Sequence, residues 1–193
     1  MMFSPSSPWL VAVLGVTALT ALGCEPGGVG DPCIPEDEYQ TAFGGYGETE
    51  ASAETKSFQC LTRVCLVNHF RGRASCPYGQ AENEGKCFVP GTDGSDPNDV
   101  IQPAVAPQFV DRQKDKAVYC SCRCDGPSED ARYCECPSGF SCTELIPNIG
   151  LGNEQLAGSY CVKDGTQYNA QSPPQTDCKP DGQGGGDCGP ANL

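Results

Sequence analysis

The sulfur atoms of 15 cysteines are the main source of chemistry in this sequence of 193 residues. The densest groups are Cys120-x-Cys122-x-Cys124 and Cys134-x-Cys136. Clustered thiolates bind zinc or copper(I). Structural zinc sites prefer Cys-x2-Cys pairs, however, and the sequence has none. We therefore expect disulfides at these positions, with no bound metal and no cofactor.

Other side chains offer little catalytic or ligand-binding chemistry. His69 is the only histidine, and its strand-like surroundings favour a half-buried strand residue over a general base. Asp93, Asp96 and Asp99 could bind calcium, but their spacing of three differs from that of an EF-hand, so a solvated acidic segment is favoured. No Gly-x-Ser-x-Gly motif is present. We predict no catalytic residues and no enzyme activity.

The N-terminal region predicts export from the cytoplasm. Residues 9–23 are apolar and end in small residues, which is typical of a secretory signal peptide. The sequence Ala21-Leu22-Gly23-Cys24 resembles the lipobox of bacterial lipoproteins, and this resemblance implies that Cys24 becomes the first residue and carries acyl chains. Ordinary cleavage after Gly23 by a signal peptidase is the alternative.

The number of cysteines favours acylation. In an oxidising compartment, 15 cysteines leave one thiol unpaired, whereas acylation of Cys24 leaves an even number that can form seven disulfides. The cysteines expected in disulfides are Cys33, Cys60, Cys65, Cys76, Cys87, Cys120, Cys122, Cys124, Cys134, Cys136, Cys142, Cys161, Cys178 and Cys188.

Composition supports a scaffold held together by disulfides. From residue 24 onward, Leu, Ile, Val and Phe occupy 25 of 170 positions, too few for a large apolar core. Disulfides stabilise small exported domains that have this deficit. The net charge of -13 argues against binding to nucleic acid or to an anionic membrane surface.

The elements that must position the cysteines are short strands and long loops. Residues 57–70 form the most strand-like run, and alternation over 117–124 places three cysteines on one face of a second strand. Further strands are expected over 132–136 and 158–162, with hairpin turns near 126 and 138. We predict a small, β-rich, irregular, disulfide-rich fold with little helix apart from the signal peptide.

Cysteine counts also bear on domain organisation. The first block has five cysteines and the second seven, both odd, so a disulfide joins the blocks unless both extra partners lie in the tail. Proximity favours a Cys178–Cys188 loop. The predicted segments are a signal peptide (1–23), a lipidated tether (24–32), a first Cys-rich block (33–90), a linker (91–115), a second Cys-rich β block (116–166) and a Gly/Pro-rich tail with a small cysteine loop (167–193).

Taken together, Cys24, the run Gly30-Asp31-Pro32-Cys33, the group Cys60, Cys65 and Cys76, and Cys120-x-Cys122-x-Cys124 give the chain a family resemblance. It resembles the cysteine-rich hypothetical lipoproteins of myxobacteria. This resemblance implies a location but no activity.

We therefore expect a protein anchored by lipid to the bacterial outer membrane or cell surface, with a structural, adhesive or partner-binding role. Its expected partners are the membrane, through the lipid on Cys24, and an extracellular protein or glycan, but not nucleic acid. Tyr39, Phe43 and Tyr46, in a loop expected to be mobile, are candidates for recognition or, equally, for packing onto the first block. A secreted protease inhibitor and an extracytoplasmic enzyme are the alternatives.

Overall fold

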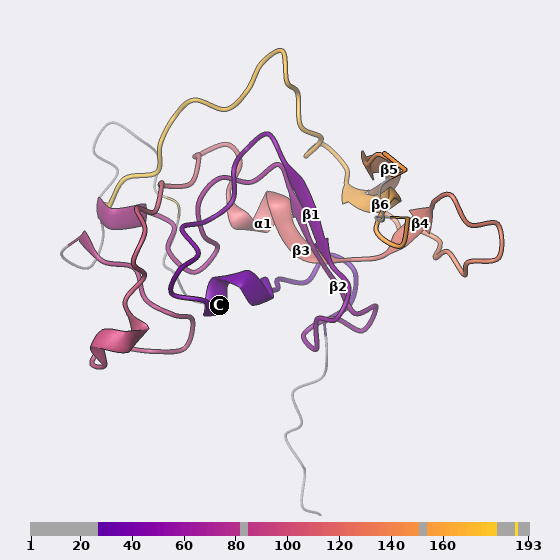
Figure 1. Ribbon diagram of the computed structural model, residues 1–193. Helices are drawn as coiled ribbons and strands as arrows, with labels where there is room; N and C mark the ends of the chain where they lie inside the picture. The colour runs from indigo at the N-terminus through magenta and orange to yellow at the C-terminus, as the bar shows by residue number, and fades with distance from the viewer. Residues whose placement is uncertain (1–26, 82–84, 151–153, 181–187, 189–193) are drawn as a thin grey trace, which may run out of the picture.

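The computed structural model describes residues 27–81, 85–150, 154–180 and 188. The predicted signal peptide and Cys24 lie outside these residues. The fold is β-rich with little helix, and it contains two small antiparallel sheets and seven disulfides, which confirms the predicted fold class. The first sheet lies in the middle of the molecule and the second at one end, with long loops on the opposite side (Figure 1).

The first sheet consists of β1 (Ala51–Glu54), β2 (Val64–Asn68) and β3 (Val118–Ser121), in the order β1-β2-β3. Every residue of β2 and β3 is buried. Successive side chains of a strand point to opposite faces. Leu66 and Tyr119 accordingly join one core cluster, while Val67 and Cys120 join another. This sheet is therefore covered on both faces.

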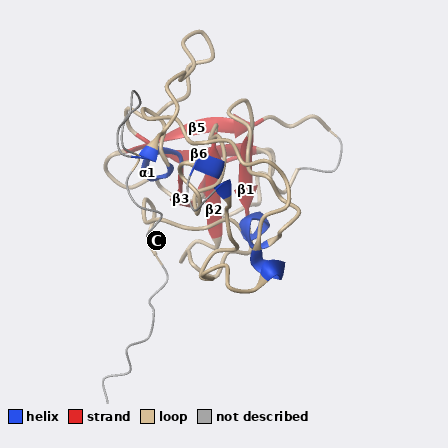
Figure 2. Ribbon diagram, turned by 90° about the vertical axis from the view of Figure 1, so that its left-hand side faces the viewer, coloured by secondary structure: helices blue, strands red, loops and turns tan. Residues whose placement is uncertain are grey.

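The second sheet packs on one face of the first. It consists of β4 (Arg123–Asp125), β5 (Phe140–Ile146) and β6 (Gly158–Lys163), in the order β4-β6-β5. Figure 2 shows β5 running across the direction of β1 and β2. Phe140 of β5 and Tyr160 of β6 pack with Leu66 and Tyr119 of the first sheet. Aromatic side chains therefore fill the space between the two sheets.

Alternation predicted a single strand over residues 117–124. The structure instead divides this cysteine-rich segment between the two sheets, which it connects. Cys120 belongs to β3 and Cys124 to β4, and Cys122 lies between these strands, where the chain leaves one sheet and enters the other. Residues 132–136 do not form the predicted strand. Disulfides fix this segment instead, since Cys134 and Cys136 are both bonded to other cysteines of the second sheet region.

Seven disulfides join all fourteen cysteines from Cys33 onward. Cys60–Cys120 is the one that connects the two predicted cysteine blocks, and Cys178–Cys188 closes the predicted loop in the tail. The pairs are Cys33–Cys65, Cys60–Cys120, Cys76–Cys87, Cys122–Cys134, Cys124–Cys142, Cys136–Cys161 and Cys178–Cys188.

Helical structure in the described residues is limited to single turns. They are η1 (Glu36–Tyr39), η2 (Gly79–Ala81), η4 (Pro97–Asp99) and α1 (Lys114–Ala117).

The loop between Cys33 and Cys60, which the sequence predicted to be mobile, is held by hydrogen bonds of two buried charged residues, Glu38 and Arg73. The Glu38 carboxylate accepts hydrogen bonds from the Ala74 and Ser75 amides, at 2.6 and 3.0 Å. The Arg73 guanidinium donates to the Glu38 and Phe43 carbonyls. Burial raises the pKa of Glu38, and these hydrogen bonds and the charge of Arg73 oppose that rise. These hydrogen bonds therefore fix η1 against the turn after β2.

The predicted linker and tail are also packed against the body. Ile101, Val105 and Phe109 of the segment 91–115 are buried, so this segment contributes to the core and is not a free spacer. In the tail, Asp177 forms an ion pair with Arg71, and the Cys178 amide donates to the Gln108 carbonyl at 2.8 Å. Sequence composition did not predict these contacts because each depends on residues far apart in the chain.

We expect the disulfides to differ in their contribution to stability. Cys60–Cys120 closes a segment of 60 residues and Cys178–Cys188 one of 10. Loop-closure entropy predicts losses of about 4 and about 3 kcal/mol, respectively. The paired substitutions Cys60→Ala with Cys120→Ala should therefore lower the free energy of unfolding in urea more than Cys178→Ala with Cys188→Ala. An equal loss of stability in the two variants, or a larger loss without Cys178–Cys188, would contradict this prediction.

Candidate functional site: a groove beside the start of the chain

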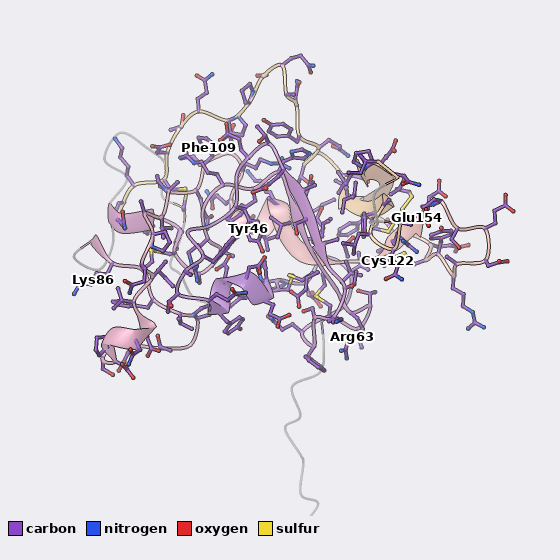
Figure 3. All side chains as sticks on the ribbon, in the orientation of Figure 1. Tyr46, Arg63, Lys86, Phe109, Cys122 and Glu154 are labelled. Carbon is purple, nitrogen blue, oxygen red and sulfur yellow. A yellow bond between two sulfur atoms is a disulfide. The ribbon has the colours of Figure 1, made fainter. Side chains whose placement is uncertain are left out.

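A groove of about 440 Å³ lies between the segment 34–39 and the segment 54–63. Its volume is within the range of small-molecule and peptide-anchor sites. One wall carries Tyr39 of η1, and the other carries Phe58 and Arg63 from the loop before β2. Figure 3 shows Arg63 at the lower end of the first sheet.

Side chains from one wall bond to the backbone of the other. The side-chain Nε2 of Gln59 donates to the Ile34 carbonyl at 2.7 Å, and its Oε1 accepts from the Ile34 backbone amide at 3.0 Å. Glu54 Oε2 accepts a hydrogen bond from the Glu36 amide at 3.0 Å. Disulfides from the neighbouring Cys33 and Cys60 tie both walls to the first sheet. These bonds hold the two walls in a fixed relation to each other and to the first sheet.

Exposed aromatic rings form the rim of the groove. Phe58 is 81% exposed and Tyr39 is 47% exposed. The Arg63 guanidinium lies 4.2 Å from the centre of the Phe58 ring, at cation–π distance. Arg63 also has a φ of 65°, in the left-handed region, which allows the loop to turn sharply into β2. Exposed aromatic residues on a rigid frame are typical of recognition surfaces.

A buried hydroxyl also lines the groove. Ser57 is only 2% exposed, and its Oγ has no hydrogen-bond partner in the described part of the chain. A buried hydroxyl without a partner costs about 1–3 kcal/mol.

The charges in the groove are mixed. Glu36 and Glu54 contribute carboxylates, and Lys56 and Arg63 contribute cations. Burial raises the pKa of Glu54, the Glu36 amide opposes this rise, and the charges of Glu36 and Asp37 add to it. A raised pKa is one property of a general acid. One oxygen of Glu54 is engaged by the opposite wall, however, and the described residues that line the groove include no histidine or cysteine. This arrangement suits the binding of a ligand that carries both apolar and charged groups.

Only one of the three aromatic candidates from the sequence reaches this site. Phe43 and Tyr46 pack together with ring centres 4.8 Å apart, and both contact the core cluster of the first sheet. Tyr39 points into the groove region and remains exposed. Phe58, Glu54 and the other groove residues were not predicted. The pattern Phe58-Gln59-Cys60, with a large apolar residue beside a disulfide in a polar loop, is the signal that could have indicated them.

His69 has a structural environment. The sequence predicted a half-buried strand residue. In the structure His69 is half-buried but directly follows the end of β2, with a φ of 50°. Its ring stacks on Tyr168 with centres 4.3 Å apart, and Nδ1 lies 3.1 Å from the Glu48 carbonyl. Burial lowers the pKa of His69, the Glu48 carbonyl opposes this, and the charge of Arg112 adds to it.

The acidic segment caps its own turns. Asp93 accepts from the Ser95 amide at 2.9 Å, and Asp96 accepts from the Asn98 amide at 2.8 Å. Clusters with metal-ligand geometry among the described residues consist of cysteines only, so these carboxylates are not brought together with Asp99.

The cysteine clusters are the closest approach to a metal site. Cys122, Cys134 and Cys161 place their sulfur atoms within 4.8 Å of one another, and two similar groups exist. Every member of these groups is bonded in a disulfide. Because metal binding requires a thiolate, the oxidised clusters pack as apolar contacts between adjacent disulfides.

Comparisons of the chain with protein-family models, curated proteins and solved structures find no match. The resemblance to myxobacterial lipoproteins therefore stays a prediction. Within the residues that the structure describes, no helix is both long and apolar enough to span a membrane.

We expect Glu54 to make the stability of this site depend on pH. The raised pKa means that folding favours the neutral carboxyl of Glu54. The stability that this neutral carboxyl contributes is therefore complete below the ordinary glutamate pKa and is lost as the pH rises through the raised pKa. Glu54→Gln, which keeps an oxygen for the Glu36 amide, should raise the melting temperature at about pH 8 and have little effect at about pH 4. Glu129→Gln, at an exposed position, is the control and should change neither value. Identical pH profiles for wild type and Glu54→Gln would refute this.

Proposed function

We propose that the protein is exported and anchored by lipid on Cys24 to the bacterial outer membrane or cell surface, where it has a structural, adhesive or partner-binding role. It does so as a rigid scaffold held together by disulfides and not as an enzyme. Its partners outside the membrane are an extracellular protein or a glycan.

The observation that carries this proposal is the complete pairing of fourteen cysteines. All cysteines from Cys33 to Cys188 are bonded to one another, so Cys24 is left with no partner within the chain. This leftover residue is also the one that follows an apolar segment ending in small residues. Acylation of its sulfur accounts for both facts.

The extent of cross-linking supports an extracytoplasmic location. Disulfides persist in oxidising compartments and are rare where thiols are kept reduced. Here the sulfur atoms are structural, since Cys33, Cys60, Cys65 and Cys120 form part of the main core cluster. In a reducing compartment this cluster would lose its covalent links.

The groove supports a binding role. It combines cross-linked walls, exposed aromatic rings and charges of both signs, and its described lining contains no nucleophile with an adjacent base. Proteins and glycans are both recognised by such aromatic and charged surfaces. The groove therefore supports binding better than catalysis.

The inhibitor alternative has one candidate loop, which Cys60–Cys120 braces near the exposed Phe58 and Leu61. A protease cleft binds an extended segment by adding it as a strand. This loop instead turns back within four residues, because the Arg63 amide donates to the Cys60 carbonyl at 2.9 Å. Its geometry favours the anchored scaffold over an inhibitor.

The anchor can be tested by intact-mass analysis of the membrane-extracted protein before and after reduction. We expect a mature chain that begins at Cys24, carries acyl chains and gains alkylatable thiols only after reduction. Cys24→Ser should lose the acyl mass and leave the membrane fraction, while the control Cys178→Ser with Cys188→Ser should keep both. A mature wild-type mass without lipid would rule out the anchor. Alkylation of the fourteen cysteines from Cys33 to Cys188 of the wild type without prior reduction would rule out the disulfide scaffold.

A further inference from the structure

We propose that the loop 56–63 is a membrane-contacting surface, and that its partner is the bilayer into which the lipid on Cys24 inserts. Phe58 and Leu61 then lie at the level of the lipid head groups, and the groove beside them accepts a zwitterionic head group. This inference rests on the proposed lipid anchor and names the partner of the groove.

The first step is the short distance between the anchor and this loop. The Gly27 amide donates to the Gln59 carbonyl at 2.7 Å, and the Leu61 amide donates to the Gly27 carbonyl at 2.9 Å. Cys24 precedes Gly27 by three residues. Three residues span about 11 Å at most. A lipid on Cys24 therefore brings the bilayer surface to this loop, and residues 27–32 are not the free tether that the sequence suggested.

The second step is the apolar character of the loop. The large hydrophobic side chains that are exposed in the described residues are Tyr39, Phe58, Leu61 and Ile149. Phe58 and Leu61 are 81% and 66% exposed, and Tyr39 faces Phe58 across the groove. Three of the four therefore lie on or beside the loop that pairs with Gly27, the first described residue. Aromatic and aliphatic side chains of this kind partition into the membrane interface.

The third step is the pattern of charge. Lys56 and Arg63 flank Phe58, and Arg63 Nη2 donates to the Lys56 carbonyl at 3.3 Å. These cations suit a lipid phosphate. Glu36 and Glu54 lie in the same groove and suit the ammonium group of the same lipid. Since the whole chain has a net charge of -13, a zwitterionic bilayer is favoured over an anionic one.

The fourth step is rigidity. The loop is closed by the hydrogen bond from the Ser57 amide to the Arg63 carbonyl at 3.1 Å, and the Cys60–Cys120 disulfide ties it to β3. Side chains held in this way contact the bilayer without the entropy cost of ordering a flexible loop. Membrane contact then also fixes the orientation of the body above the bilayer.

Tryptophan fluorescence provides the test, because the only tryptophan, Trp9, lies in the predicted signal peptide. The variant Phe58→Trp places a reporter in the loop, and Ile149→Trp places one at an exposed apolar position in the second sheet region. Each lipidated mature protein, which begins at Cys24 and has lost Trp9, is reconstituted into phosphatidylcholine vesicles with or without brominated acyl chains. Flotation of the vesicles reports the anchor separately. The wild-type protein gives the background signal.

We expect bromine to quench the tryptophan of Phe58→Trp at least about twofold more than that of Ile149→Trp, with a shift of its emission to shorter wavelength on vesicle binding. Proteins that float with equal quenching at both positions would overturn the membrane-contacting surface while leaving the anchor intact, and the groove would then be open to a protein or glycan. Proteins that carry no lipid and do not float would overturn the anchor and this inference with it.

Discussion

The Cys60–Cys120 disulfide is the constraint on which the other parts of the structure depend. It joins the loop before β2 to β3, an edge strand of the first sheet. The same loop pairs with Gly27, where the described chain begins, and forms one wall of the groove. β3 leads directly through Cys122 into the second sheet. One bond therefore sets the relative positions of the chain entry, the groove and both sheets.

Disulfides and apolar packing are not alternatives in this protein. The first sheet is buried on both faces, and its main core cluster contains four cysteines together with Val67, Phe70 and Val118. A disulfide occupies space and excludes water as an aliphatic side chain does, and it also restricts the unfolded chain. Val64, Leu66 and Val67 of β2 and Val118 of β3 are buried, and sulfur completes the core around them. This division explains how a chain so poor in Leu, Ile, Val and Phe folds.

The sequence predicted the features that depend on residue type and failed for those that depend on contacts between distant residues. The β-rich class, the strands β2 and β6 and the disulfide between the two blocks follow from composition, periodicity and parity. The change of sheet at Cys122 does not, because alternation continues through both strands and contains no sign of the break. The order in the loop around Glu38 also could not be predicted, since its partner Arg73 lies 35 residues away. The groove was missed for the same reason, because its two walls come from segments joined only in the fold.

The position of the groove limits what it can bind once the anchor is in place. With the proposed anchor, the groove would lie at the membrane surface, because the loop that forms one of its walls pairs with Gly27, three residues after Cys24. A large partner would then have to approach along the plane of the bilayer. The net charge of -13 on the chain repels other polyanions, whereas the groove itself carries Lys56 and Arg63. Because both walls are held in place, the groove cannot close far around a ligand. A ligand that already has the matching shape therefore binds with the most favourable free energy. Under the proposed anchoring, a lipid head group in the adjacent bilayer would meet these conditions, because the anchor would keep its local concentration high.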